Sequence, residues 1–302
     1  MLRSHSLRQD VRGIAQVPSI SSEPSPVKQT WLESEFQRLH SKSTAERVDF
    51  WSAALENGPL IRTEIRDLLG KRMVSDSAPL FPEKLDCTTF VETVVALSRS
   101  DSPADLFQRL IEVRYRDAQP SFTNRNHFVE ADWIPNNEKS QILKDITADL
   151  ATSAQIHVQA EDRTLHRSQW ISDQVHRQGL DREIASVPAE TKEVRVAYLP
   201  LERIEKVLSQ IPSGAIINFV REKSPKHPVL VSHQGIAVRD SQGQLMLRHA
   251  SIGGRIRTES LASYLDGMKQ HNRKMVRWGW VGLNVNQISS SSPSKILRKE
   301  AM

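Results

Sequence analysis

Cysteine is almost absent from this sequence, because Cys87 is the only one among 302 residues. A single thiol cannot form an intramolecular disulfide, so the cysteine content says nothing about the redox state of the compartment. No stretch reaches the roughly 18 uninterrupted apolar residues of a membrane-spanning helix, and we therefore expect no transmembrane segment. The sequence also lacks an internal repeat and a glycine-rich phosphate loop of either common pattern.

The first 20 residues contain basic side chains but no apolar core of a secretory signal. We expect that the protein works where it is made, or that the given start is not the native precursor start. The net charge is +5, from 41 Lys and Arg against 36 Asp and Glu, with a pI near 9.4. This small excess fits an anionic partner such as nucleic acid, acidic lipid or a carboxylate-rich polymer, but we favour a solvated surface.

Composition divides the chain into three parts. Residues 1–28 are rich in Ser, Pro and charge and are predicted to be disordered, as is the tail 288–302. Residues 29–287 are predicted to form one domain, with a polar insertion at about 140–195. The oligomeric state is not indicated by the sequence.

Helices are predicted first and strands afterwards. Helical periodicity covers 29–58, 59–70, 87–100 and 103–117, and short β-branched or aromatic runs cover 215–222, 229–240, 244–251 and 274–285. The fold class is therefore α+β, with N-terminal helices packed on an antiparallel β-sheet. The basic, Trp-containing run 273–280 alternates as a strand does, so we expect no nucleic-acid partner.

Cys87 lies where an apolar-striped helix begins. Phe90, Val94 and Leu97 recur at helical spacing, and Asp86 is suited to cap the helix N-terminus. A thiol in the first turn meets the free amides and the helix dipole, which lower its pKa and can hold an oxyanion. These properties are those of a catalytic nucleophile. The alternative is a small buried hydrophobic residue, as free cysteines usually are.

Two histidines are predicted to lie on adjacent strands of one hairpin. If the hairpin loop is Ser241–Gly243, then Gly235 faces His249, and His233 lies diagonally from His249 on the same face. A slip of one residue would place the rings on opposite faces. A histidine base with a second orienting group suits cysteine catalysis, whereas the alternative is two unrelated strand histidines. No spacing typical of a zinc site occurs, so no metal is expected.

At these residues the sequence resembles the NlpC/P60 superfamily of cell-wall cysteine peptidases. The matching stretches are "LDCTTFVE" (85–92), "SHQGIAV" (232–238) and "RHASIGG" (248–254). More narrowly, it is similar to the DUF1460 branch, which is N-acetylmuramoyl-L-alanine amidase-like. The features that carry this likeness are "RNHF" (125–128) followed by Asp132-Trp133, and then Tyr198-Leu199-Pro200.

The resemblance implies a papain-like α+β fold without a cofactor. It implies hydrolysis of the amide bond between the muramic acid lactyl group and L-alanine, with anhydro-muropeptides as favoured substrates. Cys87 would be the nucleophile, His233 the base and His249 the orienting residue. The partners would be peptidoglycan fragments, and the family's location would be periplasmic. A γ-D-glutamyl peptidase, or a non-catalytic cell-wall or polyanion-binding protein, remains as an alternative.

Four further residues are predicted to bind substrate. Arg125 would pair with a stem-peptide carboxylate and Trp133 would stack on a sugar, with His127 in the same loop and Asp86 beside the nucleophile. The alternative is a loop that packs on its own aromatic side chains.

The sequence departs from the family upstream of the cysteine. The family has a tyrosine near the nucleophile, and Met73 stands in that place. We expect another hydroxyl, such as that of Tyr115, to substitute for it.

Overall fold

The computed structural model of the protein describes residues 30–69, 79–168, 170, 190–224, 229–251, 253–274 and 279–290. The chain divides into two compact units, residues 1–30 and 31–302, and the fold is that of the second unit. The segment 1–28, for which the sequence predicts disorder, lies outside the described residues, as do Met73 and the tail from residue 291.

The first part of this unit is helical, as predicted. Helix α2 begins with a capping box, in which Ser43 and Glu46 each satisfy the other's backbone amide. No helix in the described ranges is long and apolar enough to cross a membrane. The helices are α1 (Trp31–Leu39), α2 (Thr44–Asn57), α3 (Pro59–Leu69), α4 (Cys87–Arg99), α5 (Pro103–Arg114), η1 (Arg116–Ala118), η2 (Val129–Trp133) and α6 (Ile134–Lys139).

A twisted sheet follows the helices, with strand order β2-β3-β8-β4-β5-β6-β7 and with β1 paired to β8. Its described pairings are antiparallel. The prediction of helices packed on an antiparallel sheet is therefore confirmed. The strands are β1 (Leu143–Asp145), β2 (Gln159–His166), β3 (Thr191–Pro200), β4 (Ile216–Arg221), β5 (Val231–Arg239), β6 (Leu245–Ala250), β7 (Ile256–Ser260) and β8 (Trp280–Ile288).

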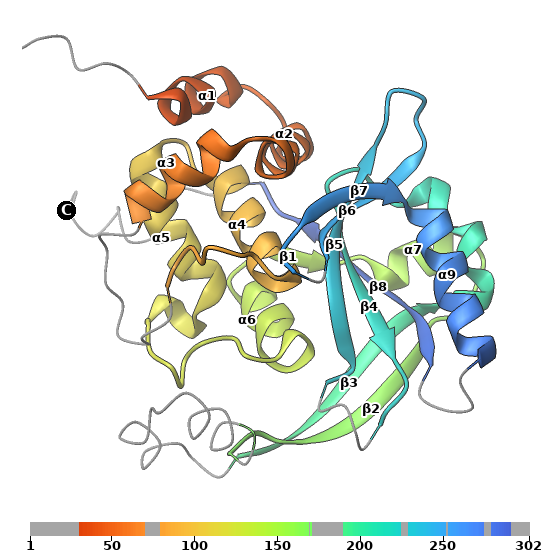
Figure 1. Ribbon diagram of the computed structural model, residues 1–302. Helices are drawn as coiled ribbons and strands as arrows, with labels where there is room; N and C mark the ends of the chain where they lie inside the picture. Colours follow the sequence, from red (N-terminus) through yellow and green to blue (C-terminus); the bar gives the residue numbers. More distant parts are fainter. Residues whose placement is uncertain are drawn as a thin grey trace, which may run out of the picture. The chain divides into compact units, whose positions relative to one another are not determined.

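The sheet separates two hydrophobic layers (Figure 1). Helices α1 to α6 cover one face, and α7 (Thr147–Ser153), η4 (Leu201–Lys206), η5 (Leu208–Gln210) and α9 (Leu261–Lys274) cover the other. Strand β5 serves both layers, because Ile236 packs in the first and Ala237 in the second. Since side chains alternate along a strand, His233 faces the α9 layer with Ala237.

Two stretches are organised differently from the sequence prediction. In the described part of 140–195, strands β1, β2 and the start of β3 join the main sheet, and α7 packs against it. The run 273–280 is not a strand throughout, because α9 continues to Lys274 and β8 starts at Trp280. Residues 275–278 lie outside the described part.

The predicted register of the β5–β6 hairpin is confirmed. Ile236 pairs with Arg248, and Gly243 adopts a φ of 79° in the loop. Gly235 then lies opposite His249, where a Cβ atom would come within 2.6 Å of Leu247 Cδ1 and 3.0 Å of His249 Cβ. A side chain at residue 235 would therefore require Leu247 and His249 to move at this close approach.

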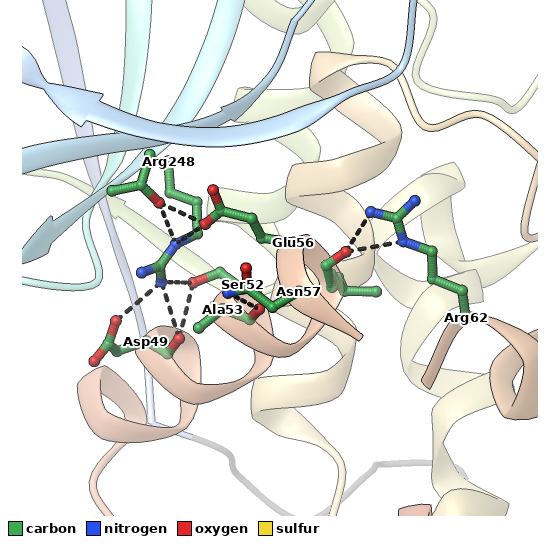
Figure 2. Close-up of polar contacts among 9 residues, drawn as sticks. Asp49, Ser52, Ala53, Glu56, Asn57, Arg62 and Arg248 are labelled. Carbon is green, nitrogen blue, oxygen red and sulfur yellow. Dashed lines mark hydrogen bonds and ion pairs between the residues drawn. The ribbon is translucent and has the colours of Figure 1, made fainter. Parts of the chain in front are cut away.

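Arg248 joins the β6–β7 hairpin to helix α2 (Figure 2). Its Nη1 donates to Asp49 Oδ1 at 3.0 Å and to Ser52 Oγ at 2.7 Å. Its Nε donates to Thr258 Oγ1 at 2.8 Å and lies 3.2 Å from Glu56 Oε2. Thr258 in turn donates to Glu56 at 2.6 Å. Strands β6 and β7 are therefore held to the helical layer by one shared polar cluster.

We predict that Arg248→Ala lowers the free energy of unfolding by about 2–3 kcal/mol, since it leaves half-buried acceptors without their donor. Urea denaturation measures the change. Arg195→Ala is the matched control, because Arg195 pairs with Asp162 across exposed side chains and its loss should cost less than about 1 kcal/mol. Equal losses in the two variants would contradict the role of the Arg248 cluster.

Candidate active site

Cys87 is the first residue of helix α4, as predicted. Asp86 caps the helix: its Oδ1 accepts the Thr89 amide at 2.7 Å, and Thr89 Oγ1 accepts the Asp86 amide at 2.9 Å. The cap fixes the backbone on both sides of the cysteine. The thiol is thereby held at the point where the helix meets strand β5.

His233 and His249 lie in direct contact. The His233 Nε2 and His249 Nδ1 atoms are 2.7 Å apart, with ring centroids at 4.9 Å. The pairing of β5 with β4 shifts by one residue beside His233, because Phe219 faces His233 but Val220 faces Val231. Bulges of this kind re-aim a side chain. The prediction that both rings share one face is confirmed.

A carboxylate continues the chain of contacts behind the histidines. Glu259 on β7 lies with its Oε1 2.8 Å from His249 Nε2, and Arg257 Nη2 pairs with the same Oε1 at 2.8 Å. Arg257 Nε also lies 3.3 Å from His249 Nε2. The shorter, charge-complementary contact assigns the His249 hydrogen to Nε2, facing Glu259. His249 Nδ1 then accepts from His233 Nε2–H, which leaves His233 Nδ1 able to accept a proton.

The cysteine and both histidines line a cavity of about 620 Å³. Asp86 lies at the same cavity, so it is beside the thiol as predicted. The remaining walls combine cationic and aromatic side chains. These include Lys84, Arg221, Arg257, Tyr264 and Trp280.

The resting thiol lies next to Thr88, with Sγ 4.0 Å from Thr88 Oγ1. The Gln234 backbone amide also favours its ionised form. Among the described residues the thiol makes no hydrogen bond with the His233 ring, although both line the cavity. Catalytic contacts of this kind are often loose before substrate binds.

The expectation of a lowered thiol pKa is wrong for this resting state. Burial raises the pKa of the Cys87 thiol, and the neighbouring Asp86 carboxylate raises it further. Hydrogen bonds from Gln234 and Thr88 oppose these effects without cancelling them. The cost of burying a thiolate exceeds what the helix start supplies, so the thiol is neutral at neutral pH.

Both imidazoles are neutral as well. Burial lowers the pKa of His233 to about 4, and the nearby His249 and Arg257 add to this effect. Burial also lowers the pKa of His249, although Glu259 opposes it. The site thus holds a neutral thiol beside a neutral base, and it can transfer the thiol proton when an electrophilic carbon approaches the sulfur.

Comparison of the sequence with known families identifies the family of this chain. The sequence model of the AmiA-like family, described as N-acetylmuramoyl-L-alanine amidase-like, matches residues 66–271. The chain belongs to this family. The matched range contains Cys87, His233, His249 and Glu259. No curated protein matches the chain.

Solved structures share the fold of this AmiA-like chain. A DUF1460 protein from Legionella pneumophila is 24% identical, with a TM-score of 0.70 over 87% of this chain and 94% of its own. An N-acetylmuramoyl-L-alanine amidase from Bacteroides uniformis is 21% identical, with a TM-score of 0.50 over 76% and 99%. A putative xylanase from Bacteroides fragilis is 24% identical, with a TM-score of 0.50 over 73% and 93%.

The other predicted substrate-binding residues of the AmiA-like chain do not line the cavity. Tyr115 and Trp133 are buried in the helical core, at 1% and 0% exposure. Tyr115 and Arg125 form an isolated antiparallel bridge. His127 Nε2 contacts the Phe122 carbonyl at 2.7 Å, and its ring packs between aromatic neighbours. The loop is built as the alternative interpretation supposes, around its own aromatic side chains.

Sequence reasoning missed Glu259 and the aromatic wall of the cavity. The tyrosine at the cavity is Tyr264 on α9, whose ring lies 5.3 Å from that of His249 and 6.1 Å from that of His233. It takes the place at the site for which we expected Tyr115. A sequence pattern indicates Glu259: Arg257 and Glu259 alternate along the strand that follows the turn after His249, so both can lie on the face of the histidine.

We predict that alkylation of Cys87 by iodoacetamide is slow at neutral pH and accelerates only above pH 8.5, roughly the pKa of a free thiol. The reason is that burial and Asp86 raise the pKa of the Cys87 thiol. Rates measured across pH test this. Asp86→Asn keeps a good helix cap but removes the charge, so its inflection should move to lower pH. A wild-type inflection well below that of free cysteine would contradict the prediction.

We predict that the His233 ring titrates near pH 4 in the folded protein, against an ordinary value of 6.5. Histidine resonances followed by ¹H–¹⁵N NMR across pH measure it, with the urea-unfolded chain as the control. Between these values the folded protein binds fewer protons than the unfolded chain, so this group makes stability fall as the pH drops. A midpoint near 6.5 in the folded state would contradict the buried, neutral base.

Proposed function

We propose that this protein is a cysteine-dependent amidase that hydrolyses the N-acetylmuramoyl–L-alanine bond of muropeptides, with anhydro forms favoured, in cell-wall turnover or recycling. The observation that carries the proposal is a cavity lined by Cys87, at the start of a helix, and by two histidines whose facing ring nitrogens lie 2.7 Å apart. Membership in the AmiA-like family supports the substrate class.

The proposed acylation step begins with the neutral pair. His233 Nδ1 takes the Cys87 proton as the sulfur attacks the lactyl carbonyl carbon, and a thioester forms. His233 then returns that proton to the departing L-alanine amine. Water, deprotonated by His233, releases the acid and regenerates the thiol.

The helix start supplies the oxyanion site in this proposal. The Asp86 cap uses the Thr89 amide, which leaves the Cys87 amide at the first turn. An N–H at a helix start carries part of the positive end of the helix dipole. A tetrahedral oxygen formed at the sulfur would therefore meet a fixed positive field.

The walls of the cavity suit an anionic, partly apolar substrate. Arg221 lies over the Trp280 ring, with its guanidinium carbon 4.7 Å from the ring centroid, and both line the cavity with Arg257. Guanidinium groups bind carboxylates in a bidentate manner, and an indole face suits the apolar face of a sugar. We assign the stem-peptide carboxylates to this cationic wall.

We further propose that the fold is the papain-like arrangement of the NlpC/P60 superfamily. The support is the placement of the nucleophile on a helix that packs on the sheet, with the base and its orienting residue on the adjacent strands β5 and β6. The periplasmic location that the resemblance implies stays an expectation.

We predict that Cys87→Ala lowers hydrolysis of a defined anhydro-muropeptide by at least about 10³-fold, because no other side chain supplies the nucleophile. Mass spectrometry identifies the fragment that gains water: a free lactyl acid supports the amidase, whereas cleavage after D-glutamate indicates a γ-D-glutamyl peptidase. Thermal unfolding of Cys87→Ala and Cys87→Ser verifies that the fold is intact. Unchanged turnover in folded Cys87→Ala would refute the cysteine mechanism.

A further inference from the structure

Glu259 occupies the far end of a line of three hydrogen-bonding side chains. In the β6–β7 register His249 pairs with Arg257, and Leu247 pairs with Glu259, so all four lie on the cavity side of the hairpin. Glu259 Oε1 is 2.8 Å from His249 Nε2, and His249 Nδ1 is 2.7 Å from His233 Nε2. The His249 side chain is 2% exposed, so it has little access to water as an alternative partner.

The carboxylate decides which way the hydrogens point along this line. A carboxylate only accepts hydrogen bonds, and Glu259 Oε1 lies nearer to His249 Nε2, at 2.8 Å, than the competing donor Arg257 Nε does, at 3.3 Å, so we place the His249 hydrogen on Nε2. Its Nδ1 is then an acceptor for His233 Nε2–H, and His233 Nδ1 keeps a free lone pair. In the opposite arrangement His249 would present a lone pair to a carboxylate, and His233 would present N–H towards the thiol. Only the first arrangement contains a base for Cys87.

We propose that Glu259 is the terminal positioning residue of the Cys87–His233–His249 relay and selects the tautomers that make His233 a base. The inference rests on the proposed cysteine mechanism. Glu259 exchanges no proton during the reaction: the thiol proton moves to His233 Nδ1 and then to the leaving amine. Its negative charge also stabilises the imidazolium that forms transiently on His233.

The hairpin holds this carboxylate from both faces. On the cavity face, Arg257 Nη2 pairs with the same Oε1 that His249 contacts. On the opposite face, Thr258 donates to Glu56 and accepts from Arg248, which ties the strand to helix α2. Because the residues on either side of Glu259 are anchored or packed, the carboxylate is fixed before substrate arrives.

Glu259→Gln tests the proposal, because the amide keeps the shape but loses the charge and can donate as well as accept. We expect kcat on a defined anhydro-muropeptide to fall about tenfold to a hundredfold with little change in KM, the range found when carboxylate partners behind metal-binding histidines are removed. In the resting protein, ¹⁵N NMR should show that His249 changes from Nε2–H alone to a mixture of tautomers.

Glu56→Gln is the matched control. It makes the same substitution against the same hairpin, but on the face that contacts Arg248 and Thr258 rather than the imidazoles. Because glutamine keeps an oxygen that can still accept from Thr258 and Arg248, the anchor is retained, and the variant should leave the His249 tautomer unchanged and kcat within about twofold. If Glu56→Gln lost as much kcat as Glu259→Gln, or shifted the His249 tautomer equally, the effect of Glu259→Gln would be merely structural and the proposal would be overturned.

A second variant, Glu259→Ala, covers the case in which the glutamine variant is unstable. Added acetate should restore part of its kcat, which a structural defect would not allow. Wild-type tautomers and turnover in Glu259→Gln, or a folded Glu259→Ala without acetate rescue, would overturn the proposal. If Cys87→Ala stays active, the cysteine mechanism fails instead, and that outcome is read independently of Glu259.

Discussion

The 2.7 Å hydrogen bond between the half-buried His233 and the buried His249 is the interaction on which the site depends. Such a bond needs one facing nitrogen to donate and the other to accept, so the two rings cannot both carry two hydrogens without placing two donors face to face. Burial favours this state, since it lowers the pKa of both His233 and His249. Burial thus keeps both rings neutral, and Glu259 determines which nitrogen of each ring carries the hydrogen.

Neutrality extends to the nucleophile. The helix start favours a thiolate, but burial and the capping carboxylate of Asp86 raise the pKa of Cys87. In the resting protein Cys87 is therefore a thiol, and in the proposed mechanism it loses its proton only when a carbonyl carbon is in place. Oxidation follows thiolate character and exposure, so the raised pKa makes the resting Cys87 thiol less reactive toward oxidants.

Much of this architecture could be predicted from local sequence patterns. The Asp86 cap and the register across Gly235 and His249 follow from capping preference, turn chemistry and strand alternation, which act over a few residues. The thiol pKa could not be predicted in this way, because burial depends on the packing of the sheet against α4.

Helix α9 could not be predicted from the sequence, for a different reason. Its buried residues Leu261, Leu265 and Met268 recur at helical spacing, but the surrounding segment is polar and contains Gly267, which weakens a helical interpretation. With α9 unrecognised, Tyr264 could not be placed at the cavity. The "RNHF" loop differs in the opposite sense: its aromatic and charged residues predict a substrate rim, whereas His127 packs against Phe122 and Trp170 and none of the four residues lines the described cavity.

The close approach at Gly235 sets the geometry of the relay at the level of the main chain. A methyl group there would lie 3.0 Å from His249 Cβ, so the close approach of β5 to β6 at this point is accommodated by the missing side chain as well as held by the strand pairing. Selection or design can vary the walls of the cavity residue by residue, but a side chain at position 235 would require Leu247 and His249 to shift. The distance between the His233 and His249 backbones therefore follows from the pairing of β5 with β6 and not from the choice of cavity side chains.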